Sequence, residues 1–164
     1  MKNLKLKEKG ILKRKWTIER FASQKDYETG NCYKKSVVNH NCLANEGINE
    51  LWTHICSAGG VKYDNTNAFL ITGTGSGAAA AGDTEATFTA GVRKGMEAGY
   101  PTYGTNQKAT WRALYGAGDA NQAWQEFGML NADGGGKLLN RLVSDQGTKT
   151  VGQVWQLTFD ITLS

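Results

Sequence analysis

The clearest pattern in the chain is a strict alternation of apolar and polar residues near its C-terminal end. The apolar members of this run are Trp155, Leu157, Phe159, Ile161 and Leu163, and each is followed by a polar residue. Successive side chains of a β-strand point to opposite faces, so a period of two predicts a strand with one buried and one solvated face. We therefore expect a half-buried strand at residues 155–163.

The first patterned segment of the chain predicts a β-hairpin. Residues 15–21 read as a strand with Trp16 and Ile18 on one face. The polar residues 23–31 that follow predict a turn, and residues 33–38 predict a second extended segment. The two strands are expected to pair with one another.

One segment has the period of an amphipathic helix. It begins near Asn45, a favoured N-cap residue, and it ends before two glycines. Its apolar positions have the helical spacing i, i+3, i+4 and i+7 and are Ile48, Leu51, Trp52 and Ile55. We expect this apolar stripe to pack on a sheet. Cys56 lies on the same side and is expected to be a small buried hydrophobe.

After residue 62 the helical period disappears and short extended runs recur between glycine-rich breaks. These runs predict strands at residues 67–72, 84–90, 107–115, 123–130 and 138–143. A chain of 164 residues with 21 glycines and one proline suits short strands and tight turns in one domain. The fold class predicted is mainly β, a β-sandwich or jelly-roll-like domain over residues 16–164 with one short helix.

The charge of the chain is concentrated at its beginning. Residues 1–15 carry a charge of +6 within a total of +4, so the rest of the chain is slightly acidic. A basic arm of this kind binds an acidic protein surface or nucleic acid, or is simply solvated. No apolar run is long enough for a membrane span or a secretory signal, which predicts a soluble, non-exported product synthesised in the cytosol.

The cysteines and glycine-rich segments give no strong chemical signal. Cys32, Cys42 and Cys56 lack the spacing of a zinc site or a disulfide framework, so free thiols are expected. The sequence GTGSGA at 73–78 formally fits a dinucleotide-binding fingerprint, but no amphipathic helix follows it. A flexible loop is the better interpretation, and the glycine-rich segments 116–119 and 133–136 are interpreted as turns.

No arrangement of residues indicates catalysis. His40 and His54 fit no metal-ligand or nucleophile pattern, and Glu85, Glu97 and Glu126 are scattered and expected to be solvated. The sequence therefore predicts a protein that is not an enzyme, with no catalytic residues, no cofactor and no metal.

Most of the chain beyond about residue 40 resembles a family of small structural proteins encoded by tailed bacteriophages. The resemblance is carried by NEGIN at 45–49, MEAGYP at 96–101, GAGDANQAWQEF at 116–127, LLNR at 138–141, and GTKT at 147–150 leading into WQLTFDITL at 155–163. These motifs are turns and strand ends, and the basic arm is not among them. The resemblance implies a virion protein, either a capsid decoration (cement) protein or a tail, head-fibre or baseplate component.

The function expected from these observations is capsid decoration, with many copies or a homo-oligomer bound to the major capsid protein. The partner-binding residues expected are basic residues of the arm and three tyrosines: Lys5, Lys7, Lys9, Lys13, Arg14, Lys15, Tyr63, Tyr100 and Tyr103. The alternative interpretation for the tyrosines is ordinary turn packing. A nucleic-acid-binding protein that uses the arm is the alternative from another class, and it predicts strongly salt-dependent binding of DNA.

Overall fold

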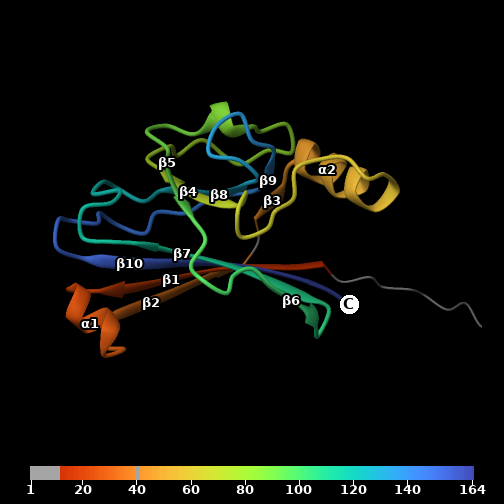
Figure 1. Ribbon diagram of the computed structural model, residues 1–164. Helices are drawn as coiled ribbons and strands as arrows, with labels where there is room; N and C mark the ends of the chain where they lie inside the picture. The colour runs from red at the N-terminus through yellow and green to blue at the C-terminus, as the bar shows by residue number, and fades with distance from the viewer. Residues whose placement is uncertain (1–11, 40) are drawn as a thin grey trace, which may run out of the picture.

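The computed structural model describes residues 12–39 and 41–164, and in them the chain folds into two antiparallel five-stranded sheets. Sheet I has the strand order β2 (Lys34–Asn39), β1 (Leu12–Phe21), β10 (Val154–Leu163), β7 (Lys108–Tyr115) and β6 (Thr102–Thr105). Sheet II has the order β3 (Cys42–Leu43), β9 (Leu138–Val143), β8 (Glu126–Leu130), β4 (Phe69–Gly73) and β5 (Val92–Gly95). Figure 1 shows the sheets as two layers, so the predicted β-sandwich is confirmed.

The core lies between the two sheets and is rich in aromatic rings. Sheet I contributes residues from its three middle strands, and sheet II contributes residues from β4, β8 and β9. They include Trp16, Trp111, Tyr115, Trp155, Phe159, Leu70, Phe127 and Met129. Trp16 stacks on Phe159, with ring centroids 4.4 Å apart, and its indole Nε1 donates to Asn140 Oδ1 in the opposite sheet at 2.9 Å. Because a buried indole N–H needs an acceptor, this bond fixes the position of one sheet against the other.

The predicted hairpin and most predicted strands are confirmed, with shifted ends. β1 pairs with β2, and both Trp16 and Ile18 are buried. The alternating C-terminal run forms β10, but this strand lies in the middle of sheet I, and its polar residues Gln156 and Asp160 are also buried. The predicted turn at residues 23–31 contains a short helix, α1 (Gln24–Glu28), because Ser23 caps its first N–H groups.

One predicted strand is wrong and three strands were not predicted. Residues 84–90 contain a 3₁₀ turn, η1 (Glu85–Thr87), because the side chains of Thr84 and Thr87 bond to the local backbone in a capping box. β3, β5 and β6 are two to four residues long and were not predicted, since such short segments show no clear alternation.

The predicted helix is present as α2 (Asn45–Cys56), at one end of sheet II (Figure 1). Most of its apolar stripe does not pack on a sheet, because Leu51, Trp52 and Ile55 are 39, 58 and 72% exposed, whereas Ile48 is half-buried. Cys56 is exposed as well, so the prediction of a buried thiol is wrong. The residue of α2 that is buried is Gly47, which lies against β9.

Candidate functional site

The basic residues predicted to bind a partner fall in two parts of the chain. Lys5, Lys7 and Lys9 lie outside the described residues. Lys13, Arg14 and Lys15 belong to strand β1, which begins at Leu12 and pairs with β10. The last residues of the predicted basic arm, 12–15, are therefore part of the sheet.

Pairing in sheet I brings two of these residues together with a third lysine. Lys13 pairs with Thr162, which in turn pairs with Lys108, so both lysines lie on the outer face of the sheet. Lys15 is on the same face, in the next row, opposite Asp160. Arg14 points to the other face. We call Lys13, Lys15 and Lys108 the basic strand end.

Asp160 lies among the lysines of the basic strand end and forms ion pairs with two of them. Its carboxylate lies 2.9 Å from the Nζ atoms of both Lys15 and Lys108, and it accepts a hydrogen bond from Thr110 Oγ1 at 2.6 Å. Burial opposes the charge of Asp160, but these three donors outweigh it, so the pKa of the carboxyl lies below its ordinary value. Three lysines around one ionised carboxylate leave this surface positive.

The three tyrosines predicted as contact points have different environments. Tyr63 is buried, and its hydroxyl donates to Lys137 O while its own carbonyl accepts the indole N–H of Trp111. The expectation that its side chain is exposed is wrong. Tyr100 is half-buried, with the guanidinium of Arg112 4.2 Å from its ring centroid. Tyr103, on β6, is 77% exposed and remains available to a partner.

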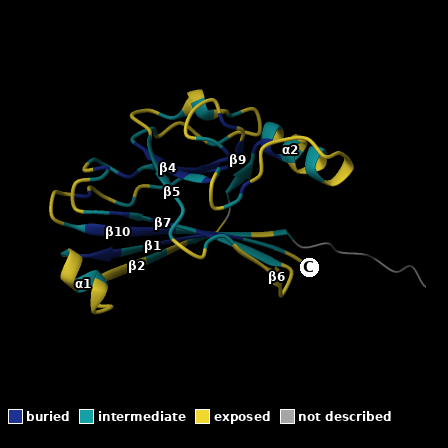
Figure 2. Cartoon of the chain, in the orientation of Figure 1, coloured by how far each residue is buried: buried dark blue, intermediate teal, exposed yellow. Residues whose placement is uncertain are grey.

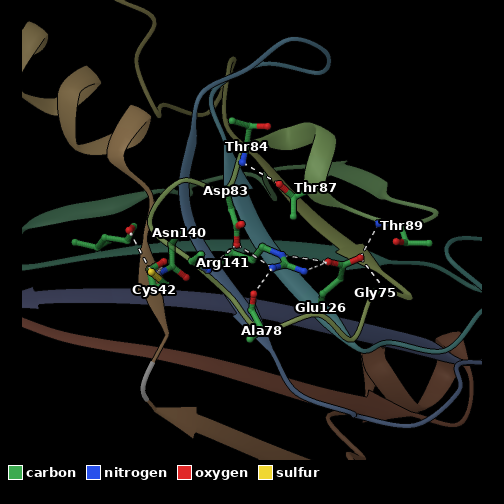
Figure 3. Close-up of polar contacts among 12 residues, drawn as sticks. Cys42, Gly75, Ala78, Asp83, Thr84, Thr87, Thr89, Glu126, Asn140 and Arg141 are labelled. Carbon is green, nitrogen blue, oxygen red and sulfur yellow. Dashed lines mark hydrogen bonds and ion pairs between the residues drawn. The ribbon is translucent and has the colours of Figure 1, made fainter.

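A buried ion-pair cluster lies behind the glycine-rich loop, and sequence reasoning did not find it. Arg141 on β9 donates from Nε and Nη2 to Glu126 Oε2 on β8, and from Nη1 to Asp83 Oδ2 at 2.8 Å and to the carbonyl of Ala78 (Figure 3). Burial works against the charge of Arg141, but the bonds to Glu126 and Asp83 outweigh it, so the pKa of the guanidinium is raised.

The same cluster holds the glycine-rich loop in place. Glu126 Oε1 accepts the backbone N–H groups of Gly75 and Thr89, at 2.8 and 2.7 Å. A Cβ atom on Gly75 would stand 2.4 Å from that oxygen, so glycine is required for this close approach. The loop at 73–78 is therefore anchored on a buried carboxylate at this point, and every group of the cluster is occupied by bonds within the chain.

The prediction that three glutamates are solvated is wrong for all of them. Glu126 is fully buried, and Glu85 is paired with Arg93. Glu97 lies over the outer face of sheet I, where it accepts bonds from Tyr27, Arg112 and Gln156. Glu126 and Glu97 connect segments that are distant in sequence. The pair Glu126–Arg141 has a local signal in the sequence, a charged residue within an otherwise apolar strand, in EFGML and LLNRLV.

The described residues contain no group of three or more His, Cys, Asp and Glu side chains that could hold a metal ion. The three cysteines are free thiols, as expected. His54 Nε2 donates a hydrogen bond to Val61 O, 3.0 Å away, and His40 lies outside the described residues. No helix in the described part of the chain is long and apolar enough to cross a membrane.

Two surfaces therefore remain as candidate binding sites: the basic strand end and the exposed apolar side of α2. Comparison with known proteins adds no assignment to either surface. The chain matches no protein-family model, and no curated protein and no solved structure is significantly similar to it.

Proposed function

We propose that the protein is a structural component of a tailed-phage virion, a decoration protein that binds the capsid shell through its basic N-terminal region. The observation that carries the proposal is the extension of the positive charge from residues 1–11 onto a folded surface. Lys13, Lys15 and Lys108 present three ammonium groups on one face of sheet I, next to the point where the lysine-rich segment joins β1.

A folded basic surface continuous with a basic segment favours an acidic protein partner. The strand end supplies positioned charges, and a segment of eleven residues can span at most about 36–40 Å, enough to contact a neighbouring subunit of a shell. Charge complementarity raises the rate of association and selects the partner. The resemblance of the remaining chain to phage structural proteins supports a capsid as that partner.

The test is occupancy on purified shells that lack the protein. Full-length protein, a variant without residues 1–11, and the variants Lys13→Glu and Lys34→Glu are incubated with shells, and bound protein is measured after sedimentation. We expect the deletion to abolish binding and Lys13→Glu to weaken it by about two- to fivefold, as for an exposed ion pair. Lys34, exposed on β2, is the matched control and should bind normally.

Two outcomes would overturn the proposal. If the deletion and Lys13→Glu leave occupancy unchanged, the basic region is not the contact. If the isolated protein binds duplex DNA tightly at low salt, with an affinity that falls steeply as salt is raised, a nucleic-acid-binding function takes its place. Copy number on intact particles separates a shell protein from a tail, head-fibre or baseplate component, because only decoration requires many copies over the shell.

A further inference from the structure

The loop between β8 and β9 contains a dipeptide that is chemically reactive by its nature. Asp133 is followed directly by Gly134, and the sequence contains no other Asp-Gly and no Asn-Gly dipeptide. Asp133, Gly134 and Gly135 are all exposed, as the colouring of this loop in Figure 2 shows. Water therefore reaches the bond between Asp133 and Gly134.

The carboxylate of Asp133 differs from those of the other aspartates because it has no partner. Within the described part of the chain it makes no hydrogen bond and no ion pair. The remaining aspartates are each held by at least one such contact, and they are Asp26, Asp64, Asp83, Asp119, Asp145 and Asp160. The side chain of Asp133 is thus free to turn toward its own backbone.

The backbone nitrogen of Gly134 is equally free of contacts. Its N–H donates no hydrogen bond within the described residues. A Cβ atom at Gly134 would have nothing within 4 Å, and the same is true at Gly135, so open space surrounds the bond. Glycine also has no side chain to hinder the approach of another group to its nitrogen. A nucleophilic nitrogen and an electrophilic carboxyl carbon are therefore adjacent and accessible.

The two ends of this loop, in contrast, are held in place. Asn131 Nδ2 donates to Val61 O at 2.7 Å, and Asn131 Oδ1 accepts the N–H of Lys137 at 2.6 Å. The N–H of Gly136, a buried residue, donates to Glu85 Oε2 at 3.1 Å. The exposed residues between these contacts can absorb a change in the backbone without displacing β8 or β9.

We propose that the bond between Asp133 and Gly134 is a site of spontaneous backbone isomerisation, from aspartate to isoaspartate, in the folded protein. The observation that carries the proposal is the absence of any contact that restrains either reacting group. The proposal concerns the isolated chain and does not rest on the proposed function.

The reaction has two steps and needs no reagent except water. The Gly134 nitrogen attacks Cγ of the protonated Asp133 carboxyl, so that the N–Cγ bond forms and the C–OH bond breaks. The hydroxyl leaves as water with the proton of the N–H group, and a cyclic imide remains. Water then opens the imide. Attack at Cγ restores aspartate, whereas attack at the α carbonyl carbon breaks the bond of that carbon to nitrogen and leaves the chain connected through the side chain.

The first test compares the reaction in the folded protein with that in the unfolded chain. Native protein is stored at mildly acidic pH with and without urea, and electron-based fragmentation of its peptides distinguishes isoaspartate from aspartate at each position. Local opening of an exposed loop costs almost no free energy, so the folded rate at Asp133 should lie within about threefold of the unfolded rate. The other aspartates should remain unchanged over the same interval.

The second test blocks the reaction without straining the fold. Gly134→Ala fits the loop, because its Cβ would have nothing within 4 Å and Gly134 is not among the residues with positive φ. The added methyl group hinders attack by the nitrogen, so isoaspartate should form at least about tenfold more slowly, which corresponds to ~1.4 kcal/mol of activation free energy. Gly118→Ala is the matched control, since nothing lies within 4 Å there either, and it should react as the native protein does.

Two further measurements do not depend on peptide fragmentation. Asp133→Asn should form the same imide with release of ammonia, and the change from amide to acid is visible in the mass of the intact protein. Protein L-isoaspartyl methyltransferase transfers a methyl group from S-adenosylmethionine to the α-carboxylate of isoaspartate. Stored native protein should accept methyl groups in the folded state, and stored Gly134→Ala should accept far fewer.

Three results would overturn the proposal. In the first, isoaspartate forms at position 133 in urea but not in the folded protein, so the loop protects the bond. In the second, Gly134→Ala reacts at the native rate. In the third, another aspartate isomerises first. Circular dichroism checks that Gly134→Ala is folded, and if its spectrum differs, Asp133→Glu, whose longer side chain disfavours the cyclic imide, replaces it.

Discussion

Gly47 of α2 and Leu139 of β9 are in such close contact that any side chain at Gly47 would overlap the backbone of Leu139. A Cβ atom there would stand 2.3 Å from Leu139 Cα and 2.4 Å from the carbonyl oxygen of Leu138. This contact is the attachment point of the helix, and it determines that the side bearing glycine and glutamate faces the sandwich.

Gly47→Ala should therefore destabilise the protein by about 3 kcal/mol, the upper range for overpacking, because backbone cannot move aside as a side chain can. Urea unfolding followed by tryptophan fluorescence measures the loss. Gly118→Ala is the control, since nothing lies within 4 Å of a Cβ atom at Gly118. Equal stabilities for the two variants would contradict the close approach.

Removal of either partner of the buried pair Arg141–Glu126 should cost about 3–5 kcal/mol, because the remaining charge is left in the core. The variants are Arg141→Met and Glu126→Gln, and stability is measured by urea unfolding. The double variant should be less destabilised than the sum of the two single changes, since it leaves no uncompensated charge of this pair. Strict additivity would mean that the two groups do not interact.

The glycine-rich loop offers a comparison between two glycines in the same segment. Gly75→Ala should destabilise by about 1–3 kcal/mol, because its Cβ would press on the Glu126 carboxylate, whereas nothing lies within 4 Å at Gly77. Gly77→Ala should be neutral or slightly stabilising, through the reduced freedom of the unfolded chain. If both changes have the same effect, the loop is not held by Glu126.

Asp160 should make stability depend on pH in the acid range. Its folded pKa is below the ordinary value of 3.8, so the folded state binds its proton less readily than the unfolded state does. The stabilisation is fully present above the unfolded pKa and is lost as pH falls through the folded one, that is, below about pH 4. The difference in unfolding free energy between native protein and Asp160→Asn should shrink as pH is lowered from 6 toward about 2.

A difference that stays constant over this interval would show that the lysine contacts of Asp160 have no net effect. The comparison with Asp160→Asn is needed because other carboxyls act in the same direction. The hydrogen bond from Lys94 outweighs the effect of burial at Asp119, for example, and lowers the pKa of that group too.

The strands were predictable from the sequence where alternation or a long apolar run was present. β9 was predicted to the residue, and β7 and β10 to within one. The orientation of α2 was not predictable, because amphipathicity normally places the apolar side against the protein's own core. A glycine in the first turn, with Glu46 directly before it and Glu50 three residues after it, was the signal for the close contact on that side.

The candidate sites were only partly predictable, because they depend on strand register. Lys13 and Lys15 stood out as part of a charge cluster, whereas Lys108 is nearly 100 residues away and joins them only through pairing with β10. In the same way, Glu126 and Arg141 meet because β8 and β9 form adjacent strands. Charges at those positions in otherwise apolar strands indicate pairing, but they do not identify the partner.

The central position of β10 in sheet I also has a consequence for the order of folding. β1 and β7 both bond to β10 and not to one another, so each has only its outer neighbour, β2 or β6, until β10 has been synthesised. Contacts between segments so distant in the chain close slowly, because the loop entropy is lost before the pairing is gained. The apolar face of the β1–β2 hairpin, which bears Trp16 and Ile18, therefore stays uncovered until β10 pairs with β1. During this interval the nascent chain is most prone to aggregation.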